Sequence, residues 1–490
     1  MKRTLLCAGL LAASAFAQQN DKAIPLSKVE RKNKAPVSNE VLHVSLPKPV
    51  ELTRPDGLRV LVLENHRLPT VYARLTILGA GAVFEPAETP GLASFTAQML
   101  NQGTASRSSR QIAEEVEGMG ASISAVAPFG SSTTVITASG LSETFPQLLA
   151  LAADIVLHPA FPESELARLK LRQKAQLMQM RAQPRFLANE VFNKAVYGSH
   201  PAAVVAPTVA SIDAMTPELL RQWHDQRYVP QNAILGIAGD VTVDQVRDAL
   251  GTLPEWNRTD LATPQPPPAK AAEVKKVRLV DRPNSVQTTL MLGNIAVKRT
   301  DPDYIPLVVM DRIVGGSPAA RLFLNLRENK GYTYNPFSSL NATLFAGPWS
   351  AFADVRTPVT EGAMTEFLNE IRRIRDEKVP AAELDEAKHA LVASFALSLE
   401  NPSELLDRAT VLRIYNLPAG YWDAYPAKIA AVTAGDVQRV AQKYLNPDSL
   451  QVVAVGDAAK IREALAKFAP VEVRDAQGKI ETPAPPAPAP

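Results

Sequence analysis

Hydrophobic and polar residues alternate in several short stretches of the first half of this chain. The stretches are rich in β-branched residues, and turn residues flank them. This period of two predicts strands in which one side of each faces a core. The predicted strands are residues 58–63, 71–78, 121–127, 132–138 and 233–238.

Longer stretches with helical spacing of apolar residues lie between these strands. The first is expected to begin with Thr89 as N-cap and Pro90 at the first helical position, a favourable start for a helix. Helices and strands are thus mixed in one unit, which predicts an α+β fold. The predicted helices are residues 90–101, 109–118, 142–157, 162–182 and 185–197.

The same landmarks return in the second half of the chain. Each residue of a pair is separated from its counterpart by a nearly constant 216 to 218 positions. Such a shift over five landmarks predicts two homologous α+β units. The pairs are Pro162 and Pro380, Ile212 and Ile429, Tyr228 and Tyr444, Pro230 and Pro447, and Gly239 and Gly456.

Changes in composition predict the boundaries of these units. A proline-rich stretch is typical of an extended linker, and a Pro/Ala-rich end cannot build a core. The expected organisation is an extended segment at 18–45, an N-terminal domain at 46–253, a linker at 254–275, a C-terminal domain at 276–470 and a disordered tail at 471–490.

Residues 1–17 have the pattern of a secretory signal peptide. A basic start is followed by a short apolar run and by Ala15-Phe-Ala17, after which cleavage is expected. A membrane anchor is the alternative, but the run is shorter than the ~20 residues that span a bilayer. Cys7 is the only cysteine, so the mature chain would have no disulfide. An exported protein, periplasmic or extracellular, is expected.

The net charge of +2 gives no reason to expect a nucleic-acid partner. Chemistry is suggested instead by the predicted helix at 90–101. Positions 94, 97 and 98 share one face of that helix, where a zinc hydrolase could place two histidines and a glutamate base. This chain carries Ser94, Ala97 and Gln98 there. None of the three is a good zinc ligand or a base near neutral pH.

The stretch 81–104 around these positions resembles the active-site region of the pitrilysin (insulinase) family of zinc metallopeptidases. Its members carry an inverted motif, His-x-x-Glu-His, in this frame, and a third ligand, a glutamate, roughly 75 residues later. Residues 168–181 contain no acidic residue. The resemblance therefore implies the family's fold, two units facing each other across a cavity, but no metal at this site and no cofactor in this chain.

A second resemblance lies at 313–334. In the family, an arginine and a tyrosine of the C-terminal unit reach toward the zinc of the opposite unit, and they fall on Arg327 and Tyr334 here. A positioned guanidinium and a phenol can stabilise the oxyanion formed when water attacks a peptide carbonyl. The alternative is a surface Arg–Glu pair beside a strand tyrosine packed on the sheet.

The resemblance implies a non-catalytic subunit that supplies Arg327 and Tyr334 in trans to a zinc-bearing homologous partner acting on peptides. A peptide-binding or scaffold protein that forms a homodimer is the second hypothesis. A hydrolase with a relocated site has no support, because the six histidines show no close pairing in the sequence. His200 is expected to be a hydrogen-bonded turn residue.

Overall fold

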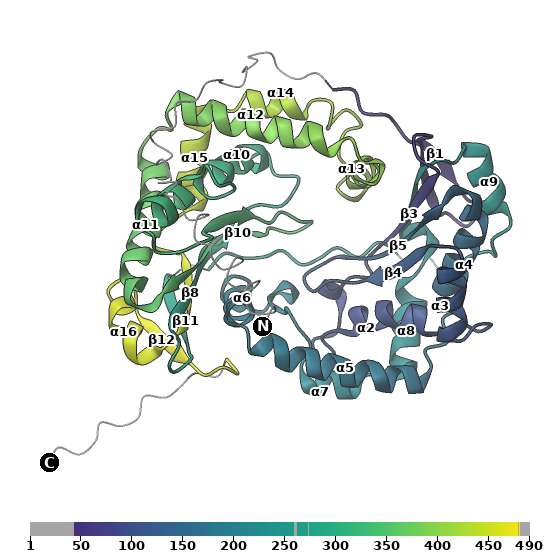
Figure 1. The fold of residues 1–490 in the computed structure, drawn as a ribbon, viewed down its shortest axis with the longest axis horizontal. Coiled ribbons are helices and arrows are strands. Elements are labelled where there is room, and N and C mark those ends of the chain that lie inside the picture. The colour runs from purple at the N-terminus through teal and green to yellow at the C-terminus, as the bar shows by residue number, and fades with distance from the viewer. Residues whose placement is uncertain (1–43, 259–261, 273, 479, 481–490) are drawn as a thin grey trace, which may run out of the picture. The chain divides into compact units, whose positions relative to one another are not determined.

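The structure, a computed structural model, describes residues 44–258, 262–272, 274–478 and 480. The predicted signal peptide and most of the N-terminal segment lie outside these residues. Two six-stranded sheets, each packed with helices, make up the described chain (Figure 1). The predicted α+β fold with two similar units is therefore confirmed. None of the described helices is long and apolar enough to cross a membrane.

The first sheet has the strand order β1-β2-β6-β3-β5-β4. Its only parallel neighbours are β2 and β6, and the other pairs are antiparallel. The strands are β1 (Val50–Thr53), β2 (Arg59–Glu64), β3 (Thr70–Leu78), β4 (Ser122–Val126), β5 (Thr133–Leu141) and β6 (Ala233–Gly239).

The second sheet has the order β12-β7-β11-β8-β10-β9. From β7 to β9 it repeats the order and the strand directions of the first sheet from β2 to β4. The strands are β7 (Lys276–Asp281), β8 (Gln287–Ile295), β9 (Phe337–Leu340), β10 (Pro348–Arg356), β11 (Gln451–Gly456) and β12 (Val471–Arg474).

Helices of the N-terminal half cover the first sheet, and their apolar residues form one core with it. They are α2 (Leu92–Met99), α3 (Ser109–Gly118), α4 (Phe145–Leu157), α5 (Glu163–Arg181), α7 (Val209–Ala214), α8 (Pro217–Arg227) and α9 (Val243–Gly251). Helix α6 (Pro184–Tyr197) of this half packs on the second sheet instead.

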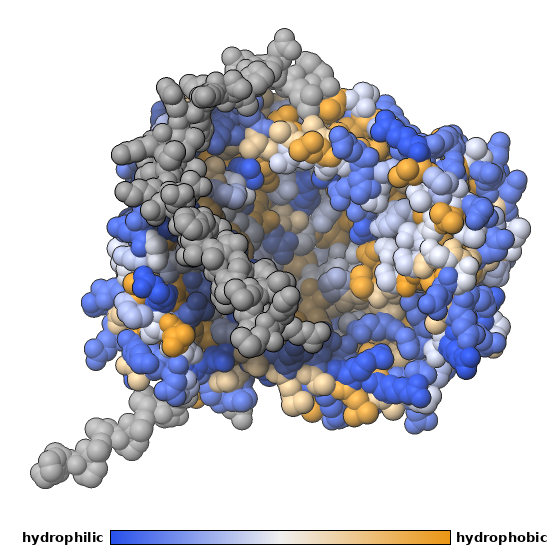
Figure 2. Space-filling view, in the orientation of Figure 1, coloured by the Kyte–Doolittle hydropathy of each residue, from blue (hydrophilic) through white to orange (hydrophobic). Residues whose placement is uncertain are grey.

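The second sheet has a core of its own with helices of the C-terminal half. They are α10 (Tyr304–Val314), α11 (Thr360–Asp376), α12 (Ala381–Ser398), α14 (Tyr425–Ala430), α15 (Ala434–Tyr444) and α16 (Ala458–Ala466). Helix α13 (Pro402–Ile414) of this half packs on the first sheet instead. On the face drawn in Figure 2, hydrophobic residues lie singly or in small groups among hydrophilic ones.

The two halves exchange one helix each. Helix α6 packs on β8 and β11 of the second sheet, where Phe192 joins a cluster with Val453. Helix α13 packs on β2 and β6 of the first sheet, where Leu406 joins a cluster with Ile234. Each half therefore completes the hydrophobic burial of the other.

A glycine in a central strand makes room for each exchanged helix. A Cβ on Gly236 would lie 2.6 Å from Leu406 Cδ1, and a Cβ on Gly293 would lie 3.1 Å from Phe192 Cζ and 2.1 Å from the carbonyl oxygen of Trp349. An ion pair adds to one contact, since Arg74 donates to both oxygens of Asp407 over 2.7 Å. Apolar burial at glycine positions thus ties the halves together.

Two sequence-based expectations are wrong in detail. Helix α2 does not begin at Thr89, because Gly91 is the N-cap, with a φ of 99° that a β-branched residue would strain to adopt. Residues 471–474, predicted to belong to a disordered tail, form β12, which pairs in parallel with β7. Alternate residues of this strand, Val471 and Val473, pack against the second core.

Candidate functional site

Helix α2 is held by packing on one side and by a carboxylate at its start. Its apolar residues lie against α8 and β4. Glu85, on the turn before the helix, accepts hydrogen bonds from the backbone N–H of Gly91 (2.8 Å) and of Ala93 (2.6 Å). A carboxylate at a helix N-terminus satisfies donors that the helix itself leaves free. Burial nevertheless raises the pKa of Glu85 to about 7.

The face of α2 that carries the predicted site positions is half-buried at Ser94 and Gln98, whereas Ala97 is buried. Gln98 Nε2 donates to Ser94 Oγ over 3.0 Å. Gln98 Oε1 in turn accepts from Nε2 of Gln173 on α5, also over 3.0 Å. The three side chains form one hydrogen-bonded chain, so Ser94 and Gln98 each have a polar partner on this half-buried face.

Gln173 lies 75 residues after Gln98. This is the distance at which the resemblance predicts the third zinc ligand. The family carries a glutamate there, and an amide in its place gives no signal of a metal ligand in the sequence. The three positions expected to hold a metal therefore do come together in space. They carry a hydroxyl and two amides.

Ser94, Gln98 and Gln173 do not fit a zinc ion. Zinc in proteins is bound by thiolate, imidazole or carboxylate, and none of these groups is present in the chain of three. In the part of the protein that the structure describes, no group of three or more His, Cys, Asp or Glu is placed to hold a metal ion.

His200 illustrates how the described histidines are used instead. Its Nδ1 accepts from the backbone N–H of Ala202 over 3.1 Å, and its Nε2 lies 2.9 Å from the carbonyl oxygen of Pro267. The predicted hydrogen-bonded turn histidine is confirmed.

The second predicted pair lies on and after a π-helical segment, η7 (Phe323–Asn329). Leu326 anchors this segment in the core, and Asn325 donates to Glu366 and Glu370 of α11 over 2.9 and 2.7 Å. π-Helical segments are rare and occur frequently at functional sites. Because Leu326 faces the core and Asn325 faces α11, Arg327 lies on the outer side of the segment.

Arg327 and Tyr334 lie against each other. The guanidinium carbon of Arg327 is 4.2 Å from the ring centroid of Tyr334 and 4.6 Å from that of Phe323, so the cation lies between two aromatic faces. Arg327 Nη1 also donates to the carbonyl oxygen of Tyr334 over 3.2 Å. The ring of Tyr334 is not packed on the sheet, because the residue is 78% exposed.

One part of the alternative interpretation is present too, since Arg327 Nε lies 3.3 Å from a carboxylate oxygen of Glu328. The ion pair is on the surface and can rearrange at little cost. The geometry thus offers an exposed phenol and a guanidinium, side by side. Whether a partner's active site receives them stays a prediction.

Comparison with known proteins identifies the family of this chain. A family model described as Insulinase (Peptidase family M16) matches residues 59–205, and one described as Peptidase M16 inactive domain matches residues 214–391. Together they cover roughly two thirds of the chain. This protein belongs to the M16 peptidase family.

Solved structures agree with the M16 assignment. A crystal structure of a peptidase M16 inactive domain from Pseudomonas fluorescens is 27% identical, with a TM-score of 0.75 over 84% of this chain and 98% of that one. A protease from Helicobacter pylori shares the fold, with a TM-score of 0.76 at 18% identity over 84% of this chain and 100% of that one.

Curated relatives carry the names of zinc proteases. An uncharacterized zinc protease of Bacillus subtilis, YmxG, is 24% identical over 72% of this chain and 85% of its own. One of Mycobacterium leprae is 26% identical over 73% of this chain and 80% of its own. This M16 chain carries Ser94, Ala97 and Gln98 where its resemblance to the family predicts the zinc motif.

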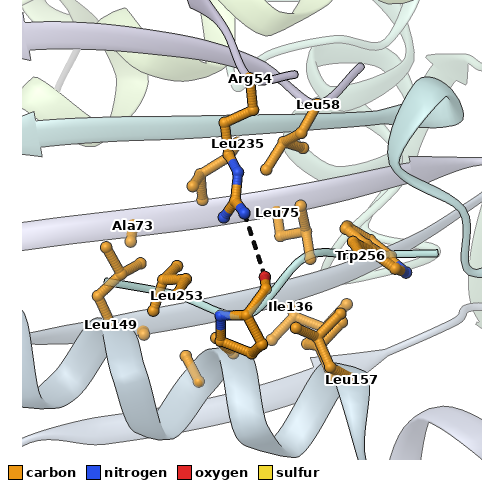
Figure 3. Close-up of a pocket in the computed structure, with 15 residues that line it drawn as sticks. Arg54, Leu58, Ala73, Leu75, Ile136, Leu149, Leu157, Leu235, Leu253 and Trp256 are labelled. Atoms are coloured by element: carbon orange, nitrogen blue, oxygen red, sulfur yellow. Dashed lines mark hydrogen bonds between the residues drawn. The ribbon is translucent and has the colours of Figure 1, made fainter. Parts of the chain in front are cut away.

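Pockets of this M16 chain also lie outside these sites. One, of about 60 Å³, is an apolar gap between α4 and the first sheet, and Arg54 donates to the carbonyl oxygen of Pro254 at its mouth over 3.1 Å (Figure 3). It is too small for a drug-sized ligand. Another, of about 560 Å³, is lined by both halves, including Tyr72 of β3, Ser139 of β5 and Asn401 before α13.

Proposed function

We propose that this protein is the non-catalytic subunit of a heterodimeric zinc metallopeptidase. It would supply part of the wall of a peptide-binding chamber and the pair Arg327 and Tyr334 to the zinc site of a homologous partner. One observation carries the proposal. Ser94, Gln98 and Gln173, at the proposed metal positions, are hydrogen-bonded to one another. Arg327 and Tyr334, by contrast, lie on and just after an anchored segment, and Tyr334 is exposed to solvent.

In such a complex the catalytic groups would be divided between the two subunits. The partner would bring the cation and the activated water, and the attack on a peptide carbonyl would build negative charge on its oxygen. A guanidinium and a phenol donate to that oxygen most effectively when they are already positioned. Arg327 meets this condition, since two aromatic rings and the backbone of Tyr334 restrain it.

Peptide binding has a structural basis in the first sheet. Strand β4 is an edge strand and contacts α2, which carries the former metal positions. An extended peptide can add to such an edge through main-chain hydrogen bonds. Asn101 already donates to the carbonyl oxygen of Ile123, so the part of the edge toward Val126 is the better candidate.

The N-terminal sequence adds a proposed location. Export through the pattern at 1–17 would place the mature chain in the periplasm or outside the cell. A zinc-bearing homologue in the same compartment would be the expected partner.

Reconstitution with the zinc-bearing homologue tests this proposal. The chain alone, with added zinc, should not cleave unstructured peptides, and the pair should cleave them. Replacing Arg327 by Ala or Tyr334 by Phe should lower kcat of the pair by roughly 100-fold or more, the usual effect of removing one oxyanion donor. Peptide cleavage by the purified chain alone would refute the proposal.

The second candidate is a peptide-binding or scaffold protein that acts as a homodimer. The absence of a metal-ligand group among the described residues, together with the open edge of β4, favours it. In that case light scattering would show a dimer of this chain alone. Replacing Arg327 would then change the affinity of the protein for peptides but would not affect a rate of peptide cleavage.

A further inference from the structure

A cationic side chain is buried in the C-terminal half, and no carboxylate of the described residues forms an ion pair with it. Arg299, just before α10, is 9% exposed. Its Nη1 donates a hydrogen bond to Tyr421 Oη over 3.2 Å. Among the residues that the structure describes, no aspartate or glutamate forms an ion pair with it. Burying a charge in this way is unfavourable unless another group compensates for it.

Aromatic rings surround Arg299. Its guanidinium carbon lies 3.9 Å from the ring centroid of Tyr304 and 5.5 Å from those of Tyr421 and Trp422. Aromatic faces attract a cation and hold a planar guanidinium in one orientation. They carry no net charge, so most of the five N–H donors of this guanidinium remain available to an acceptor.

Arg299 lines a pocket of about 480 Å³. It lies where α10 contacts α14 and α15, three helices that are grouped in Figure 1. Lys428, at the end of α14, lines the same pocket, and its Nζ is 4.7 Å from the ring centroid of Tyr421. Two cations thus flank one tyrosine in a space of the size that small ligands occupy.

The other charged groups of the lining are already engaged. Asp436 accepts from the backbone N–H and the hydroxyl of Thr433, where it completes the cap of α15, and Asp301 accepts from the backbone N–H of Asp303. Arg439 forms ion pairs with Asp303 and Asp436. Arg299 and Lys428 are therefore the cations of this pocket without an acidic partner among the described residues.

We propose that this pocket binds the carboxylate group of a small organic acid or of a peptide C-terminus. Arg299 is the main donor and Lys428 the second cation. The fork of a guanidinium matches the two oxygens of a carboxylate. A dianionic phosphate suits the pocket less well, because Asp301 and Asp436 also line it. Ile305 completes an apolar wall for the carbon skeleton of the ligand.

Binding to defined probes tests the proposal on the full chain. The probes are acetyl-Ala-Leu-Ala as the free acid, its C-terminal amide, isovalerate and inorganic phosphate, each measured by calorimetry and by the shift of the thermal midpoint. The free acid should bind and raise the midpoint, and the amide should do neither. Binding of the peptide acid at least tenfold tighter than isovalerate identifies a peptide terminus, and equal binding identifies a small organic acid.

Two variants assign the binding to the named cations. Arg299→Met should abolish binding of the acid while the protein stays folded, because an apolar side chain replaces an uncompensated buried charge. Lys428→Met, at an exposed position, should weaken binding several-fold and leave the fold unchanged. Arg110→Met, which removes an exposed arginine on α3, is the matched control and should bind like the wild type.

Three results would overturn the proposal. The first is equal binding of the acid and the amide, and the second is unchanged binding of the acid by Arg299→Met. The third is binding of phosphate without binding of the acid. The proposal does not depend on the partner role of Arg327 and Tyr334, so either can fail alone.

Discussion

Gln173 Nε2 lies 3.0 Å from Gln98 Oε1 and joins α5 to α2 at the place where the family's resemblance predicts a third metal ligand. The three positions at which the resemblance predicts metal ligands therefore lie close together, and they carry neutral side chains. This relationship makes a gain-of-function experiment possible.

The variant Ser94→His, Gln98→His, Gln173→Glu should bind one zinc ion per chain. Two imidazoles and a carboxylate supply the ligand set of a catalytic zinc site. Ala97 is left unchanged, because it is 1% exposed and an unpaired glutamate there would be buried. Metal content after dialysis, with calorimetry for affinity, measures the result.

The matched control for this experiment carries only the two histidines. Without the glutamate at position 173 its zinc affinity should be at least tenfold lower, since one of the three protein ligands is missing. A folded triple variant that holds no more zinc than the wild type would show that the three positions do not converge on one metal.

The contact between Gly236 and Leu406 predicts a stability effect across the two halves. Gly236→Ala should lower the free energy of unfolding by about 1–3 kcal/mol, because the new Cβ overlaps a side chain that is 0% exposed. Urea unfolding measures the change. Gly251→Ala, where nothing lies within 4 Å of a Cβ, should cost nothing.

Leu406→Ala in the Gly236→Ala background separates overlap from a backbone effect. The double variant should be more stable than the sum of the two single changes predicts, because the shortened side chain makes room for the Cβ. If the two stability changes simply add, the effect of Gly236→Ala comes from the conformation of the strand and not from the contact with α13.

Glu85 predicts a pH dependence of stability. Burial raises its folded pKa to about 7, above the ordinary value of 4.5, so the native state keeps this proton to higher pH than the unfolded chain does. Its contribution is fully present below pH 4.5 and is lost as the pH rises through 7. The loss should be about 1–3 kcal/mol.

Glu85→Gln isolates this contribution from other titrating groups. Its uncharged amide oxygen can still accept from Gly91 or Ala93, so the variant should lack the decline between pH 4.5 and 7. The measured quantity is the difference in free energy of unfolding between wild type and variant at several pH values. A difference that changes in favour of the wild type as the pH rises would contradict the expected sign.

Arg327 and Tyr334 should matter little for stability. Tyr334→Phe should change the free energy of unfolding by less than about 0.5 kcal/mol, because the residue is 78% exposed. Arg327→Ala should cost about 1 kcal/mol or less, the value of exposed cation–π contacts. By contrast, Leu326→Ala, at a buried position of the same segment, should cost about 2–5 kcal/mol.

Thermal and urea unfolding of these three variants check the contrast. The result separates a surface pair available to a partner from residues that hold η7 in place. Loss of several kcal/mol in Arg327→Ala would mean that its side chain supports the segment, and activity losses in a reconstituted complex would then have a structural cause.

The sequence by itself determined the local elements and the duplication. Strand β5 and helix α5 follow from periods of two and 3.6 in the apolar positions, and the returning glycine at the ends of β6 and β11 marks the two homologous units. It also showed that the metal ligands are gone, because residue identity alone decides which groups can bind zinc.

Only the tertiary structure decided which distant residues meet. Gln173 reaches Gln98, Leu406 fills the space above Gly236, and Arg299 is buried among aromatic rings far from it in sequence. Such contacts depend on how helices pack across sheets, and a single residue's type carries no information about them. Short edge strands such as β1 and β12 escaped prediction for the same reason, since their pairing partners, and not their own sequence, hold them in place.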